Sequence, residues 1–226
     1  MKSNSKKLKI VVYIDGSNLY FSIKKTFNCK IDIERLCKKL IGNNELIKVN
    51  YYIAPVEQFS NPVMYAEQQS FFEKLKKIEK LNIIFGRLEK RRKGGEIYYV
   101  EKASDVNLAL DLVLDAQKEA YDEAYLISND GDFSGAVNSA INFGKKVIYV
   151  AIGNRKSISH HLKKVASRTF YISKDFISNC ELWVVWVISN RTAELFVKWV
   201  GCAEYKYRFM HTPKFLCEKG KSINGR

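Results

Sequence analysis

The sequence predicts an α/β protein, a doubly wound layer of mostly parallel strands with helices on both faces. Two observations carry this prediction. Short apolar segments rich in β-branched residues alternate with helical patterns from residue 8 to about 175. Strands that are apolar on both faces belong to parallel sheets covered on both sides. Because crossovers between parallel strands are right-handed, the helices are expected to divide between the two faces.

The first half of the chain alternates strand and helix. Strands are expected where continuous apolar or β-branched runs occur, at 8–14, 45–53 and 82–85. Helices are expected after capping residues, from the Asp15-Gly16-Ser17-Asn18 turn to Thr26, at 33–40 after Asp32, and from Asn61-Pro62 to about residue 80.

The second half begins with a predicted hairpin over 87–100, in which Gly94-Gly95 supplies the turn. Ser104 is expected to cap a helix that runs to about residue 120. The remaining elements follow the same alternation: strands at 123–127, 145–151 and 169–172, and helices at 133–143 and 159–167.

Composition points to a soluble protein with a polyanionic partner. The chain has 226 residues, of which 46% are hydrophobic, and its 38 Lys+Arg exceed its 24 Asp+Glu by 14. Such a balance favours nucleic acid or an anionic membrane surface. The longest apolar run in the remainder of the chain, 182–188, is far below the roughly 20 residues of a membrane span. The five cysteines lack zinc-site spacing, so a reduced, cytoplasmic protein without a membrane partner is expected.

The C-terminal residues differ in composition from the rest. All three tryptophans and three of the five cysteines lie after residue 176. We therefore predict one domain over 8–175 and an extension over 176–226, to which the sequence assigns no role.

The residues that indicate chemistry are acidic, within a basic protein. Asp15 directly follows the first strand, Asp130 and Asp132 follow the strand at 123–127, and Asp105 lies in the first turn of its helix. Ligands of open parallel sheets bind outside the carboxyl ends of the strands, where strand order reverses. Carboxylates about 4 Å apart repel by about 4 kcal/mol per pair at an effective dielectric near 20, so a converging cluster calls for a cation. Mg²⁺ or Mn²⁺ suits a site without His or Cys and supports phosphodiester hydrolysis.

Each acidic residue also has a purely structural interpretation. Asp15 and Asp132 each precede a helix that they could cap, and Asp105 could complement a helix dipole. Asp111 and Asp115, four residues apart on one helix, are expected to form a solvated stripe. Independent caps need not converge, so joint placement separates the two interpretations.

Three ordered motifs, VVYIDGSNLY (11–20), EKASDVNLALDLV (101–113) and YLISNDGDFSGAVNSAINFGKKVIYV (125–150), resemble the NYN domain, and more closely its bacterial LabA-like branch in the PIN-like nuclease superfamily. The resemblance implies a PIN-like three-layer fold with central strand order 3-2-1-4-5 and a metal-dependent ribonuclease-type site. By position it places the acidic set on Asp15, Asp105, Asp130 and Asp132, and it matches Asn18 and Ser128 to further motif residues.

Two positions need comment beside this resemblance. Asp111 also matches a family Asp, but it lies about 120° around the helix from Asp105, so we expect it to support the site rather than hold metal. Asn129 stands where the family usually has Gly, and we expect the loop to survive because Asn tolerates a positive φ.

Basic groups cluster on the predicted hairpin. The run 87–93 is a solvated charge run or an arm that grips phosphate. Tyr98 and Tyr99 alternate on its returning strand, so one of them could stack on bases. The nucleic-acid-binding residues that we predict are Lys102, Arg87, Arg91, Arg92 and Ser128.

Together these features predict a metal-dependent ribonuclease-like enzyme, an endoribonuclease, that uses Mg²⁺ or Mn²⁺ and leaves DNA open as a substrate. Asn18 is expected to orient the site or the substrate. The alternative is a non-catalytic RNA-binding or regulatory module on the same fold. The oligomeric state stays open, with a homodimer among the options.

Overall fold

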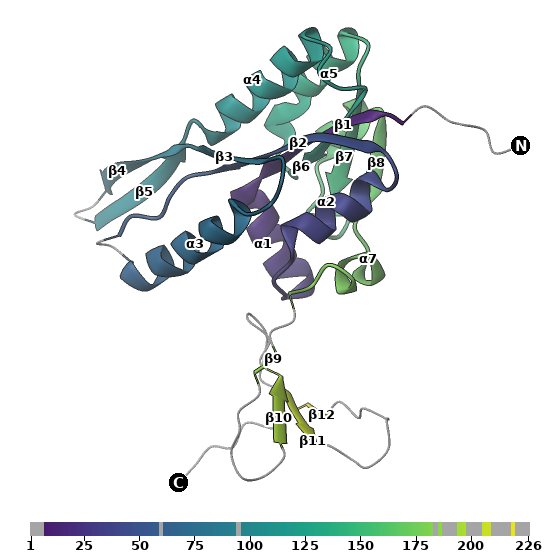
Figure 1. Ribbon diagram of the computed structural model, residues 1–226. Helices are drawn as coiled ribbons and strands as arrows, with labels where there is room; N and C mark the ends of the chain where they lie inside the picture. Colours follow the sequence, from purple (N-terminus) through teal and green to yellow (C-terminus); the bar gives the residue numbers. More distant parts are fainter. Residues whose placement is uncertain are drawn as a thin grey trace, which may run out of the picture.

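A computed structural model describes residues 7–58, 61–93 and 96–182, together with four short strands in the C-terminal extension (Figure 1). Its centre is a six-stranded sheet whose strands are all parallel. The strands of this sheet are β1 (Lys9–Asp15), β2 (Glu45–Ile53), β3 (Leu81–Phe85), β6 (Glu123–Ile127), β7 (Lys146–Ala151) and β8 (Arg168–Tyr171).

The strands lie in the order β3-β2-β1-β6-β7-β8. Counted within this sheet alone, the order is 3-2-1-4-5 with β8 as a sixth strand at the edge, which confirms the prediction and extends it by one strand. Strand order reverses between β1 and β6, which pair from Ile10↔Glu123 to Ile14↔Ile127. Ligands of such sheets bind at this reversal, outside the carboxyl ends of the strands.

Helices cover both faces of the sheet, as predicted (Figure 1). One face carries α1 (Gly16–Phe27), α2 (Ile33–Ile41), α3 (Pro62–Leu75) and α7 (Lys174–Ser178), and the other carries α4 (Ser104–Gln117), α5 (Ser134–Asn142) and α6 (His160–Val165). Side chains of β1 alternate between the two layers: Val12 and Ile14 pack with α1 and α2, and Val11 and Tyr13 pack with α4 and α5.

Several helices begin where the sequence placed their caps. The Asp32 carboxylate accepts from the Arg35 N–H at 3.0 Å, and the Asn61 side chain accepts from the Met64 N–H at 3.0 Å. Ser159, predicted as the first residue of a helix, is instead the cap of α6. The predicted cap at Ser104 is wrong. Ser104 is the first residue of α4, and the residue before it, Ala103, has a left-handed backbone with φ of 74°.

Two further boundaries differ from expectation. Helix α3 ends at Leu75, five residues early, because the chain turns through Lys80 at φ of 64° to enter β3. The packed core also continues beyond residue 175, since Ile177 and Cys180 are fully buried in the α1–α2 layer.

Two smaller sheets complete the described structure. The predicted hairpin is a separate antiparallel ribbon of β4 (Arg87–Lys93) and β5 (Glu96–Lys102). The extension contributes β9 (Val185–Trp186), β10 (Glu194–Val197), β11 (Tyr205–Arg208) and β12 (Glu218–Lys219), joined in an antiparallel sheet. Within the described residues, no helix combines the length and the hydropathy of a membrane span.

Candidate functional site

Asp15 ends β1 at the point where strand order reverses, and its side chain is 9% exposed. One carboxylate oxygen, Oδ1, accepts the Asn18 N–H at 3.0 Å, so Asp15 caps α1. The other oxygen, Oδ2, accepts the Ser128 hydroxyl at 2.9 Å from the loop after β6. Asp15 therefore caps a helix, as its structural interpretation predicted, and it also lies at the reversal point of the sheet.

Asn18 and Asn129 join α1 to the loop that follows β6. The Asn129 N–H donates to Asn18 Oδ1 at 2.9 Å, and the Asn129 side-chain amide donates to the Ile152 carbonyl at 2.7 Å. The Tyr149 hydroxyl donates to Asn129 Oδ1 at 2.7 Å and accepts the Ser159 N–H at 2.9 Å. Burial raises the pKa of Tyr149 to about 12, so its hydroxyl keeps its proton at neutral pH and serves as a donor.

The expectation for Asn129 was therefore wrong in its physical reason. Asn129 does not have a positive φ; it replaces Gly as a polar bridge, through both ends of its amide. Sequence reasoning missed Tyr149 and Asn129 as parts of the site. The signal for Asn129 was its departure from the family motif, whereas nothing in the sequence pointed to Tyr149.

The loop after β6 presents the next two acids. Ser128 is 2% exposed, and its oxygen also accepts the Asp130 N–H at 3.1 Å. Asp130 Oδ1 accepts the Asp132 N–H at 3.0 Å, so Asp130, rather than Asp132, caps the 3-10 turn Gly131–Phe133. Asp130 is half-buried and Asp132 is exposed. Ser128, expected to contact nucleic acid, is instead buried and holds Asp15 and Asp130 in place.

The two remaining sequence-predicted acids lie on α4. Asp105 is exposed in the first turn, and the start of this helix packs against Gly86, directly after the carboxyl end of β3. Asp111 accepts the Tyr52 hydroxyl at 2.7 Å, and Tyr52 pairs in register with Asp15. Asp111 thus supports the strand next to the site through Tyr52.

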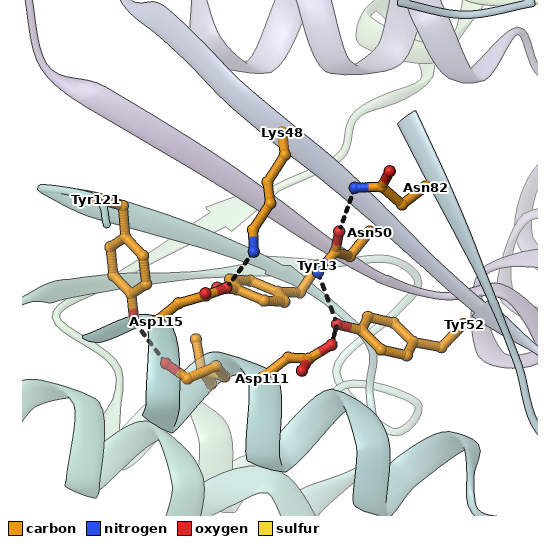
Figure 2. A network of polar contacts seen from close by, with 9 residues as sticks. Tyr13, Lys48, Asn50, Tyr52, Asn82, Asp111, Asp115 and Tyr121 are labelled. Carbon is orange, nitrogen blue, oxygen red and sulfur yellow. Dashed lines mark hydrogen bonds and ion pairs between the residues drawn. The ribbon is translucent and has the colours of Figure 1, made fainter. Parts of the chain in front are cut away.

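Figure 2 shows a polar network beneath α4 to which both Asp111 and Asp115 belong. Asp115 accepts the Tyr13 hydroxyl at 2.6 Å and pairs with Lys48 at 2.8 Å, and its side chain is only 14% exposed. Burial, followed by the bond to Asp115, raises the pKa of Tyr13 far above its ordinary value. The prediction of a solvated stripe is therefore wrong, because both carboxylates face the tyrosines of the sheet.

The match to a family model covers most of the chain: the model of the NYN domain matches residues 9–174. The chain belongs to the NYN family. This family is part of the PIN-like nuclease superfamily. Among solved structures, a Vibrio parahaemolyticus protein of unknown function is similar at 24% identity and a TM-score of 0.61, over 78% of this chain and 99% of that one. That likeness shows the fold alone, and no curated protein matches the chain.

The donor atoms of this NYN domain suit a hard divalent cation. The Ser128 hydroxyl donates to the Asp15 carboxylate at 2.9 Å and accepts the Asp130 N–H at 3.1 Å, and the carboxylates of Asp15 and Asp130 are oxygen ligands of the kind that a hard cation binds. In the part of the chain that the structure describes, no three His, Cys, Asp or Glu residues gather closely enough to hold a metal ion. Mg²⁺ is commonly held by one or two carboxylates, water and substrate phosphates, and Asp15 with Asp130 fit that pattern.

The basic ribbon of the NYN domain continues the chain beyond the carboxyl end of β3 (Figure 1). Register places Arg87 opposite Lys102, and Arg91, four residues from Arg87 on the same strand, shares their face, whereas Arg92 lies on the other face. Arg91 also pairs with Glu89 at 3.4 Å. Three of the four predicted basic residues therefore share a face; the side chains of Tyr98 and Tyr99 lie outside the described ones.

Proposed function

We propose that this NYN domain is a metal-dependent endoribonuclease that hydrolyses RNA phosphodiester bonds at the carboxyl edge of its sheet. Asp15, Asp105, Asp130 and Asp132 hold Mg²⁺ or Mn²⁺ directly or through water, and Asn18 orients the site. The observation that carries the proposal is the buried Asp15 carboxylate at the strand reversal, held by the Asn18 N–H and the Ser128 hydroxyl.

The hydrogen bonds of the site fix the carboxylate before any ligand arrives. Because Asn18 and Ser128 each donate to a different oxygen of Asp15, its side chain has one orientation. A carboxylate oxygen has two lone pairs, so a hydrogen-bond donor and a metal ion can share one oxygen. A divalent metal supplies an activated water and stabilises the attacking and leaving oxygens.

The basic residues support RNA as the partner. Arg87, Arg91 and Lys102 share one face of the ribbon, and cationic side chains on such an arm make sequence-independent contacts with phosphates. DNA remains open as a substrate. The LabA-like branch and a cytoplasmic location are part of the same proposal.

The test is a nuclease assay on labelled RNA and DNA, with Mg²⁺, Mn²⁺ or EDTA. Loss of groups that merely orient metal ligands lowers activity 10- to 100-fold, so Asp15→Asn and Asp130→Asn should each lower cleavage by more than about 100-fold. Glu45→Gln is the matched control, since Glu45 is exposed at the opposite edge of the sheet. Cleavage that survives EDTA, or that both Asn variants retain, would contradict the proposal.

The alternative is a non-catalytic RNA-binding or regulatory module. The observation that favours it is the lack, among the described residues, of a group of three acids close enough for a metal ion. RNA binding with a steep salt dependence, in a wild-type chain that never cleaves, would establish this alternative.

A further inference from the structure

We propose that the outer face of α1 is a stacking platform for unpaired RNA bases, formed by Tyr20, Phe21 and Lys24. Phe21 stacks on a base, Tyr20 supports Phe21, and Lys24 contacts the backbone phosphate. The inference rests on the proposed function, since it specifies single-stranded RNA as the substrate class of the same site.

The two aromatic side chains are exposed although they lie on a well-packed helix. Tyr20 is 50% exposed and Phe21 is 65% exposed, whereas Leu19 and Ile23 on the inner face are 2% and 3% exposed. The helix is thus anchored by its inner face, and the two rings contribute little to the core. Adjacent exposed aromatic rings are a common feature of surfaces that bind single-stranded nucleic acid.

The contacts among the three side chains assign a separate role to each. The Tyr20 and Phe21 rings meet edge to face, with centroids 5.3 Å apart and planes at 73°. The Lys24 ammonium lies 5.6 Å from the centroid of Tyr20 and 3.5 Å from its hydroxyl. Tyr20 therefore has contacts with both neighbours, and Phe21 is the more accessible ring for a base.

The platform lies close to the candidate site along the same helix. Asp15 caps α1, and Phe21 follows it by six residues, which is about 9 Å at 1.5 Å per residue. A stacked strand advances about 3.4 Å per nucleotide, so two to three nucleotides span this distance. A strand whose phosphate lies at Asp15 can therefore reach Phe21 with a nearby base.

Charge favours nucleic acid over other partners for this face. Helix α1 has Lys24 and Lys25 in its last turn and no acidic residue. A second exposed apolar helix face, formed by Val106, Leu110 and Leu114 on α4, has no aromatic and no basic residue in its helix. Of these two faces, that of α1 combines open rings with cations, which is the combination that binds bases and phosphates together.

Base pairing distinguishes the ligands that this platform accepts. A base inside a duplex has both faces covered by its neighbours, whereas an unpaired base can be splayed out onto an aromatic ring. The platform therefore selects loops, ends and single strands over duplex RNA.

The test measures equilibrium binding by the full chain in EDTA, so that cleavage plays no part. The probes are a fluorescent single-stranded RNA 12-mer and the same sequence in a duplex. Because Phe21→Ala loses one stacked base, it should bind the single strand about 10-fold more weakly. Its binding to the duplex, and the slope of its single-strand affinity against salt concentration, should stay unchanged. Phe21→Trp should restore binding, and Lys24→Ala should lower the salt slope by about 0.7. Phe143→Ala, which alters a ring 47% exposed at the opposite edge of the sheet, should bind as wild type.

The outcomes separate this inference from the proposed function. Weaker single-strand binding by Phe21→Ala in a chain that never cleaves RNA would support the platform and refute the nuclease. Asp15-dependent cleavage, with unchanged binding by Phe21→Ala, would overturn the platform alone. An equal loss on single strand and duplex would also overturn it.

Discussion

Ser128→Ala tests whether the loop after β6 is held by the bonds that the structure shows. The Ser128 hydroxyl donates to Asp15 Oδ2 at 2.9 Å and accepts the Asp130 N–H at 3.1 Å. Alanine removes both bonds and keeps the backbone. Because Ser128 is 2% exposed, bulk water is poorly placed to replace the hydroxyl.

The size of the effect follows from the two bonds. A hydrogen bond to a charged group contributes about 1.5–3 kcal/mol and a neutral one about 0.5–1.5 kcal/mol, so we expect a loss of about 2–4.5 kcal/mol. For a chain of this size, each kcal/mol lowers Tm by about 2–4 °C, which gives a fall of roughly 4–18 °C.

The assay is urea unfolding followed by far-UV circular dichroism. Ser139→Ala is the control, because the Ser139 hydroxyl donates only to the Gly135 carbonyl on the surface of α5 and should cost less than about 0.5 kcal/mol. In an Asp15→Asn background the cost of Ser128→Ala should shrink by about 1 kcal/mol, since the charge-assisted bond is already lost. Equal unfolding free energies for the two alanine variants would refute the role assigned to Ser128.

Three further predictions concern the packing beneath the site. Gly16→Ala should cost about 1–3 kcal/mol in urea unfolding, since a Cβ there would lie 2.5 Å from the Tyr51 ring and 2.8 Å from the Tyr52 carbonyl oxygen. An unchanged unfolding midpoint would contradict this and mean that the helix can move away. Tyr13→Phe should cost about 1.5–3 kcal/mol in the same assay, because it removes the donor to the charged Asp115, and a loss below about 0.5 kcal/mol would contradict the network. Burial raises the pKa of the Cys37 thiol from about 9 to about 12. The neutral thiol therefore contributes its full stability below pH 9, and this contribution is lost as the pH rises toward 12. Thermal melts should show Tm falling between pH 9 and 12, and a flat profile would contradict the burial.

The sequence predicted the elements of the fold wherever local signals and tertiary packing agree. Strands β2 and β6 have the predicted bounds, because continuous apolar runs define buried parallel strands. The end of α3 and the start of α4 were predicted less well. Both depend on left-handed backbone at Lys80 and Ala103, residue types that do not signal a positive φ.

For the candidate site, the sequence predicted which residues follow strands but not which side chains contact one another. Asp15 and Asp130 follow strands, and the strand order that joins β1 to β6 brings the Asp15 carboxylate and the Asp130 N–H to one hydroxyl group, that of Ser128. The bond from Tyr149 to Asn129 was not predictable, because it links β7 to a loop 20 residues earlier through side chains alone. Similarly, the spacing of Asp111 and Asp115 showed that they share a helix face but not that tyrosines lie under it.

The aspartates beneath α4 and those of the loop after β6 differ in their partners. Beneath α4, Asp115 is neutralised by Lys48 at 2.8 Å and Asp111 is bonded to Tyr52. At the carboxyl edge, Asp130 and Asp132 form no ion pair with any lysine or arginine that the structure describes. The chain has an excess of 14 basic residues, yet Lys48 lies under α4 and no lysine or arginine occurs in the loop 128–133. Because uncompensated carboxylates repel phosphate, this distribution supports a divalent cation as the partner that lets RNA approach the edge.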